Sequence, residues 1–284
     1  MTTPFQPQPA LRVAFQGERG AFSEAAAIDY FPTEIEPVPC AEFDDVFRAV
    51  VDGACDQGVV PIENSLGGSI HRNYDLLLRH QLTIVGEVNL RVVHNLIVLP
   101  GVDVADVRRV YSHPQGLAQC EGAIDRLGLE RVPTYDTAGS VKLLREQGIR
   151  DGAVIASRRA AEVYGMTILM AGIEDDQENF TRFLVLSREA SPPPRVDMPA
   201  KTSLVFAAAN VPGSLFKALS VFALRDIDLT KIESRPLKGK PFEYYFYLDF
   251  AGSMAEPRCL KALDHLAEYA SFVRVLGSYP RAGW

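Results

Sequence analysis

The first two-thirds of the chain alternates short apolar runs with stretches of helical periodicity. The apolar runs Leu11–Gln16 and Gly58–Ile62 predict buried strands, and helical patterns follow at Ser23–Tyr30 and Ser69–Arg79. The rhythm repeats at Arg109–Ser112, Gly116–Leu127, Val132–Tyr135, Thr137–Glu146, Ala153–Ala156 and Arg158–Tyr164. Such alternation is typical of parallel βαβ units with helices on both faces of a sheet. The predicted fold class of this part is therefore α/β.

Two segments interrupt this rhythm. Leu90–Leu99 is a long aliphatic run that suits a connection between two lobes, and Ala190–Arg195 contains three consecutive prolines. Prolines in succession cannot occupy a helix interior or a central strand, so they predict a stiff extended linker. We therefore expect a region over 11–190, whose second lobe spans about 90–170, a linker over 191–200 and a module over 201–280.

The module after the linker has its own pattern. Apolar and polar residues alternate cleanly from Phe242 to Phe250, which predicts a half-buried strand. The other predicted strands are Thr202–Ala207, Leu229–Ser234 and Phe272–Leu276, and the predicted helices are Pro212–Arg225 and Pro257–Tyr269. The resulting βαββαβ order predicts a ferredoxin-like module.

Composition narrows the possible functions. The chain is 47% hydrophobic and 23% charged, as in globular proteins, and its net charge of −7 argues against a nucleic-acid partner. No apolar stretch reaches the length of a membrane span. The four cysteines are scattered, and Met1–Ala10 lacks the basic and apolar regions of a signal peptide. These features predict a cytoplasmic protein without a membrane partner.

Several loops between predicted strands and helices carry polar side chains. Gly17–Ser23 suits a tight turn in which Ser23 caps the helix, or a loop that offers amides to an anion. Glu63, Asn64 and Ser65 end a strand before two glycines, which suits a ligand crevice or an elaborate turn. In Asp136–Ser140 either Asp136 or Thr137 caps a helix, and Thr137 could also contact a ligand.

His113 lies in a similar loop, Ser112–Cys120. It could act as an acid–base group, since its reference pKa is near neutrality. No other histidine lies at metal-ligand spacing, and Pro114 suits the first turn of a helix. We therefore predict a structural role for His113 and no metal site.

The segment Asp175–Leu186 leads a polar run into Thr-Arg-Phe and then into an apolar strand. In a regular strand Thr181 and Phe183 face one way and Arg182 faces the other. Thr181 is thus the better candidate for contact with reacting atoms, whereas Arg182 could pair with Asp175 or Asp176 to hold the loop.

Together these segments resemble prephenate dehydratases. GERGAFSEAAA, PIENSLGGSI, YSHPQGLAQC, DTAGSV, AVIASRRAAEVYG and DDQENFTRFLVL stand in the order of that family over residues 11 to 188. The resemblance implies a bilobal fold like type II periplasmic binding proteins, with the active site between the lobes. It also implies conversion of prephenate to phenylpyruvate, CO2 and water, without metal or organic cofactor. It gives Thr181 as the catalytic donor and, as substrate-binding residues, Ser23, Asn64, Ser65, Thr137, Asn179, Arg182 and Phe183.

The C-terminal module resembles an ACT regulatory domain through NVPGSL and ESRP. This implies feedback by L-phenylalanine and pairing into a homodimer or homotetramer. The implied phenylalanine-binding residues are Asn210, Val211, Pro212, Gly213, Ser214, Leu215, Glu233, Ser234 and Arg235. The alternatives are an arogenate dehydratase, a non-catalytic solute-binding protein and an amino-acid-sensing regulator.

Overall fold

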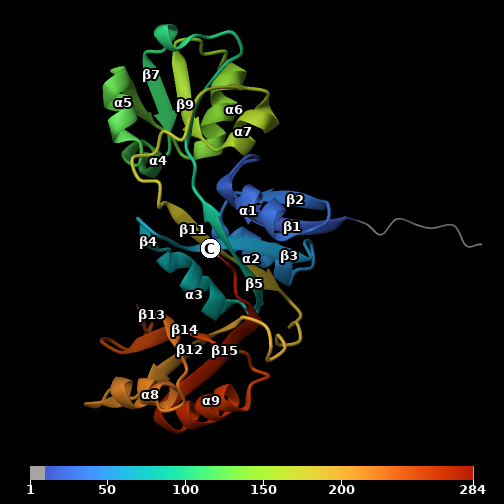
Figure 1. Ribbon diagram of the computed structural model, residues 1–284, viewed down its shortest axis with the longest axis vertical. Coiled ribbons are helices and arrows are strands. Elements are labelled where there is room, and N and C mark those ends of the chain that lie inside the picture. The colour runs from blue at the N-terminus through green and yellow to red at the C-terminus, as the bar shows by residue number, and fades with distance from the viewer. Residues whose placement is uncertain (1–9, 284) are drawn as a thin grey trace, which may run out of the picture. The chain divides into compact units, whose positions relative to one another are not determined.

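The computed structural model describes residues 10–283 (Figure 1). The N-terminal segment behind the prediction of no signal peptide therefore lies almost wholly outside the described residues. A first sheet has the strand order β2-β1-β3-β11-β5, and the short β4 pairs with β3. These strands are β1 (Leu11–Gln16), β2 (Ile35–Cys40), β3 (Gln57–Asn64), β4 (Gly68–Ser69), β5 (Thr83–Arg91) and β11 (Phe180–Ser187). Helices α1 (Phe22–Tyr30) and α2 (Phe43–Val51) connect β1, β2 and β3, and β1 runs parallel to both partners.

The second sheet has the order β10-β6-β9-β7-β8. Its strands are β6 (Asn95–Val98), β7 (Arg109–Ser112), β8 (Glu130–Pro133), β9 (Gly152–Ala156) and β10 (Thr167–Ala171). β7 is parallel to β8 and β9, but β6 is antiparallel to β9 and β10. The expectation of parallel units is therefore wrong at β6, where the chain enters this sheet from β5 of the first sheet and runs opposite to β9 and β10.

Helices cover both faces of this second sheet. Ala153 and Ile155 of β9 belong to one apolar cluster, with residues of α4 (Pro114–Ala118) and α5 (Glu121–Leu127). Val154 belongs to another, with α6 (Thr137–Gln147) and α7 (Arg158–Tyr164). Alternate residues of one strand thus enter two cores, which explains why β9 is apolar throughout.

The predicted helix Gly116–Leu127 is split in two. α4 ends before Gln119 and α5 begins after Cys120. Asp175 explains the break, because its backbone N–H donates to Gln119 O at 2.8 Å and its carboxylate accepts from Gly122 N at 3.1 Å. A residue far along the chain therefore caps the start of α5, and no local pattern reveals it.

The C-terminal module is an antiparallel sheet of order β13-β14-β12-β15 covered by two helices. Its elements are β12 (Ala200–Ala208), α8 (Ser214–Ala223), β13 (Leu229–Pro236), β14 (Tyr244–Ala251), α9 (Pro257–Tyr269) and β15 (Ala270–Pro280). The predicted βαββαβ order is confirmed. The prediction that the alternating strand begins at Phe242 is wrong: Phe242 precedes β14, has φ 63° and is 84% exposed.

The chain divides into two compact units. One contains the residues up to Gly68 together with Leu90–Phe183, and the other contains Ser69–Asn89 together with the residues from Leu184 onwards. Helix α3 (His71–Arg79) therefore belongs to the same unit as the C-terminal module. In the predicted linker, 191–200, residues 191–199 carry no helix or strand, and β12 begins at the last residue, Ala200.

Candidate active site

Asn64, the last residue of β3, is the centre of a buried polar cluster. Its Nδ2 donates to Asn179 Oδ1 at 2.7 Å and to Thr181 Oγ1 at 3.0 Å. Its Oδ1 accepts from the backbone N–H of Gly67 at 2.7 Å. Asn64 and Thr181 are each 9% exposed, and Asn179 is fully buried. The ends of two neighbouring strands thus hold three polar side chains in one fixed arrangement.

The Thr181 hydroxyl is arranged as a hydrogen-bond donor. Because Oγ1 accepts from Asn64, its own proton must point elsewhere, and no acceptor for it lies among residues 10–283. A hydroxyl that already accepts a hydrogen bond is polarised and becomes a stronger donor. Asn179 adds a second open group, since its buried Nδ2 has no hydrogen-bond partner in the described part of the chain.

Ser65 holds the loop before β11. Its Oγ donates to Glu178 O at 2.7 Å and accepts from Phe180 N at 2.9 Å. Its backbone N–H donates to Phe180 O at 2.8 Å. The hydroxyl is therefore engaged by the backbone on both sides, and this geometry gives Ser65 a positioning role.

Arg182 faces away from the Asn64 cluster and pairs with Glu63, with Nη2 to Oε1 at 2.8 Å. The expectation that Arg182 pairs with Asp175 or Asp176 is wrong. These two carboxylates instead accept hydrogen bonds from the backbone N–H groups of Gly122 and Glu178. Glu63 is adjacent to Asn64 on β3, so the strand pairing selects it as the partner. Phe183 is 2% exposed and packs in the core, so its substrate contact remains a prediction.

Ser23 and Thr137 lie at the starts of two helices. The expectation that Ser23 caps α1 is wrong: Ala21 is the N-cap, and Ser23 lies in the first turn at 7% exposure. Asp136, not Thr137, caps α6 by accepting from Gly139 N at 2.7 Å. Burial raises the pKa of Asp136. Neither Ser23 nor Thr137 makes a side-chain hydrogen bond to another described residue, so both hydroxyls can take a ligand.

Close backbone approaches bring the motifs together. A Cβ on Gly20 would lie 2.5 Å from Ala160 Cα, and Ser157 Oγ donates to Gly20 O at 2.6 Å. A Cβ on Gly67 would lie 2.7 Å from Gln115 Nε2. Loops separated by many residues in sequence are thus neighbours. Glycine is required at Gly20, where the neighbouring atom belongs to the backbone, whereas the Gln115 side chain beside Gly67 can move.

His94 is a polar residue that the sequence interpretation overlooked. It is 3% exposed, its Nε2 lies 2.9 Å from Gln119 Oε1, and its ring packs edge-on against Phe22 at 5.5 Å. Nδ1 is buried without a hydrogen-bond partner among the described residues, and burial lowers the pKa of His94. The available signal was a His-Asn pair inside the apolar run Leu90–Leu99.

The structural role predicted for His113 fits the geometry. His113 is the N-cap of α4, and its Nδ1 accepts from Gln115 N at 3.2 Å. Pro114 follows at the first helical position, where its missing N–H costs nothing. Within residues 10–283 no cluster of side chains could hold a metal ion, and no helix could span a membrane.

The predicted phenylalanine segments lie in two different settings. Asn210–Gly213 is an exposed turn in which Gly213, at φ 79°, is the N-cap of α8. Glu233 of β13 instead contacts Ser69, which lies in β4 just before α3: Glu233 Oε2 accepts from Ser69 Oγ at 2.5 Å. Arg235 pairs with Asp75 through two hydrogen bonds of 3.2 Å. We call these two contacts the α3 clasp.

The fold and site define a two-lobed α/β protein with a buried amide–hydroxyl cluster at the ends of adjacent strands and a ferredoxin-like module attached. The family model of prephenate dehydratase matches residues 13–191, and the chain belongs to this family.

Named relatives align with nearly the whole chain. "Arogenate dehydratase/prephenate dehydratase 2, chloroplastic" of Arabidopsis thaliana is 54% identical over 95% of this chain and 73% of its own length. "Arogenate dehydratase 2" of Petunia hybrida is 53% identical over 95% and 72%. The expectation of a cytoplasmic protein is wrong by this comparison, because the Arabidopsis relatives are chloroplastic proteins.

Two solved structures superimpose closely. A prephenate dehydratase from Arthrobacter aurescens in complex with L-Phe is 31% identical with a TM-score of 0.88, over 95% of this chain and 90% of that one. A structure described as GqqA, a novel type of quorum quenching acylase, is 37% identical with a TM-score of 0.89, over 95% and 97%. The same fold therefore accompanies different activities, and the function must be argued from the site.

Proposed function

We propose that the chain converts prephenate to phenylpyruvate, with loss of CO2 and of the ring hydroxyl. The observation that carries the proposal is the Asn64–Thr181 hydrogen bond of 3.0 Å, which leaves the threonine proton for the substrate. Membership of the prephenate dehydratase family supports the reaction class, a hydro-lyase.

The reaction makes modest demands on the protein. The bond between the ring and its carboxylate breaks, its electrons enter the ring, and the C–O bond to the ring hydroxyl breaks at the opposite carbon. The departing hydroxide needs a hydrogen-bond donor, and Thr181 supplies it. The proton that turns the hydroxide into water comes in the end from solvent: if it passes through Thr181 Oγ1, a solvent proton restores the hydroxyl. Aromatisation provides the driving force, so positioning together with this donor accounts for catalysis. No step requires a metal or an organic cofactor.

The remaining predicted contacts serve to hold the substrate. Asn179 offers its open Nδ2, and Ser23 and Thr137 offer hydroxyls at the first turns of α1 and α6. Helix N-termini favour carboxylates, of which prephenate has two. Ser65 and Arg182 act through the loop and the strand that they hold.

Arogenate is the second candidate substrate, because relatives at 53–54% identity are named arogenate dehydratases. Arogenate carries an ammonium where prephenate carries a keto oxygen, and the reacting ring is the same. Turnover of the two compounds should be measured side by side on one preparation. A large preference for arogenate would replace prephenate in the proposal and leave the role of Thr181 intact.

The decisive variant is Thr181→Ala. We expect kcat to fall by at least about 100-fold, the size of a general-acid contribution, while the melting temperature stays close to that of the wild type. Thr181→Ser keeps the hydroxyl and should retain most of the activity. Normal turnover in Thr181→Ala, with folding intact, would remove Thr181 from the mechanism.

We further propose that L-phenylalanine binds the C-terminal module near Asn210–Leu215 and Glu233–Arg235 and lowers activity. The Arthrobacter aurescens structure in complex with L-Phe supports the ligand. We also propose a homodimer or homotetramer paired through this module, which exposes Val211, Phe216 and Leu224 at 58%, 76% and 76%. Calorimetry with L-phenylalanine and sedimentation analysis test the two points; absence of binding or a monomer would refute the respective one.

A further inference from the structure

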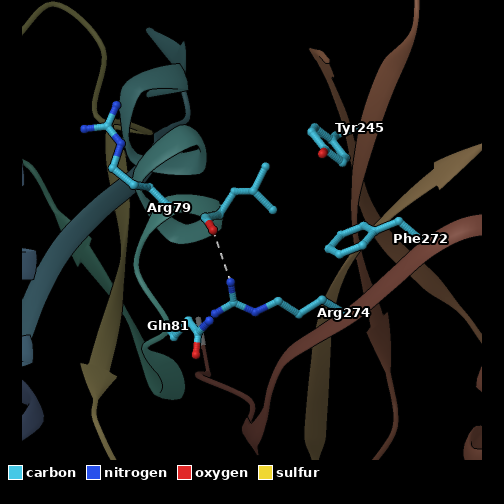
Figure 2. Close-up of a pocket in the computed structure, with 6 residues that line it drawn as sticks. Arg79, Gln81, Tyr245, Phe272 and Arg274 are labelled. Atoms are coloured by element: carbon cyan, nitrogen blue, oxygen red, sulfur yellow. Dashed lines mark hydrogen bonds between the residues drawn. The ribbon is translucent and has the colours of Figure 1, made fainter. Parts of the chain in front are cut away.

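A cavity of about 490 Å³ lies within the unit that contains the C-terminal module (Figure 2). Its lining residues are Leu78, Arg79, Gln81, Tyr245, Phe272 and Arg274. They come from the end of α3 and the residues after it, from β14 and from β15. Neither the Asn64 cluster nor the predicted phenylalanine segments contribute a residue, so the cavity has no role in the proposed function. Its volume suits a small organic ligand.

One wall of the cavity is aromatic. The rings of Tyr245 and Phe272 meet edge to face with centroids 5.7 Å apart, on the same side of the cavity (Figure 2). Phe272 is 37% exposed, which is a large apolar surface to leave in contact with water. A wall of this shape favours a flat apolar body that covers both rings.

Arg274 gives the cavity a positive charge. Its guanidinium donates to the carbonyls of Leu78 and His80 at 3.2 Å and of Leu82 at 3.3 Å. No carboxylate lies within ion-pair distance of Arg274 in the described part of the chain. Burial lowers the pKa of Arg274, as expected for a desolvated cation without a counter-ion. An anion in the cavity would supply the missing charge.

The polar groups around the cavity define the ligand further. The Gln81 amide and the Tyr245 hydroxyl make no hydrogen bond to other described residues, and no acidic side chain lines the wall. An ammonium group would therefore meet the Arg274 guanidinium and no carboxylate (Figure 2). We propose that this cavity binds a planar aromatic carboxylate that lacks an amino group.

Titration calorimetry of the full-length protein with trans-cinnamate tests the proposal. Cinnamate should bind, and uncharged cinnamamide should bind at least tenfold more weakly. Phe272→Ala should lower the affinity for cinnamate at least tenfold. The matched control is Phe242→Ala, at an exposed position outside the cavity, and it should leave the affinity unchanged. Gln81→Ala, at an exposed position, should also weaken binding and serves if Phe272→Ala does not fold.

The candidate active site is a second place where an aromatic carboxylate could bind, and Thr181→Ala separates the two. Binding through the cavity predicts the same affinity in Thr181→Ala as in the wild type. The proposal is overturned if cinnamate does not bind, or if Phe272→Ala and Gln81→Ala both bind it with wild-type affinity. It is also overturned if Thr181→Ala loses the binding. None of these outcomes depends on whether the chain is a dehydratase.

Discussion

At the scale of single residues, the Asn64 amide uses both its oxygen and its nitrogen to organise the candidate active site. It fixes the loop at Gly67 through its oxygen and orients Thr181 and Asn179 through its nitrogen. Strand alternation was enough to separate Thr181 from Arg182, because side-chain direction in a strand depends only on position. The partners could not be predicted, because Glu63 and Asn64 are more than a hundred residues from β11, and strand pairing sets such contacts.

This arrangement predicts coupling between Asn64 and Thr181. Asn64→Ala removes the donor to Oγ1, so we expect kcat to fall at least tenfold. In the double variant with Thr181→Ala the losses should not add, because the second substitution removes a hydroxyl that is already misplaced. The measurement is a double-mutant cycle on kcat. Losses that multiply would show that the two side chains act independently.

His94 predicts a pH dependence of stability. Its pKa is lowered by burial in the folded state, so below about pH 6.5 the unfolded chain binds the extra proton more readily than the folded one. The free energy of unfolding should therefore fall as pH decreases through this window, by up to about 1.4 kcal/mol per pH unit. Gln119 and Glu174 face the ring and backbone of His94 and moderate the effect.

The variant His94→Gln tests this assignment. It removes the titrating group and keeps a polar side chain beside Gln119. Urea unfolding at pH 7.5, 6.5 and 5.5 should show a shallower slope in the variant than in the wild type. Equal slopes would assign the pH dependence to other groups.

At the scale of secondary structure, the apolar pattern predicted the strands and helices of the C-terminal module and most of those in the second lobe. It missed β10, and it read the run that contains β6 as a connection between two lobes. It assigned nothing between Phe31 and Gln57, where β2 and α2 lie. β2 contains Pro37 and Pro39, which weaken a strand signal, and the sheet accepts them because β2 is an edge strand. The strand is therefore visible only once the sheet order is known.

Gly20 lies where the loop before α1 packs closely against α7. Its φ of 90° and the 2.5 Å approach of a Cβ to Ala160 Cα leave no room for a side chain. Gly20→Ala should destabilise the fold by about 3 kcal/mol or more, as overpacking and backbone strain add. The matched control is Gly128→Ala, which has φ 61° and nothing within 4 Å, and should cost about 1 kcal/mol. Equal losses in chemical denaturation would contradict a packing role for Gly20.

At the scale of the whole molecule, sequence resemblance predicted a regulatory module but not its contact with α3. Glu233 and Arg235 were expected to bind phenylalanine, yet in this structure they form the α3 clasp with Ser69 and Asp75. Ser69 follows the loop that begins at Asn64, so the clasp holds the chain that leads into the candidate active site. Residues that both hold a catalytic loop and lie in a ligand segment can couple the two sites.

Coupling of this kind predicts that binding and inhibition can be separated. Ser69→Ala with Asp75→Ala removes both contacts of the clasp and leaves the predicted phenylalanine residues unchanged. We expect L-phenylalanine to bind this variant within a fewfold of wild-type affinity, measured by calorimetry, but to inhibit phenylpyruvate formation at least fivefold more weakly, because a typical coupling energy of about 1–3 kcal/mol is lost. The control is Asp264→Asn, at an exposed position of α9, and L-phenylalanine should inhibit this variant as strongly as the wild type. Full inhibition of the double variant would show that the signal does not pass through the clasp, and loss of phenylalanine binding would assign Ser69 and Asp75 to the ligand site itself.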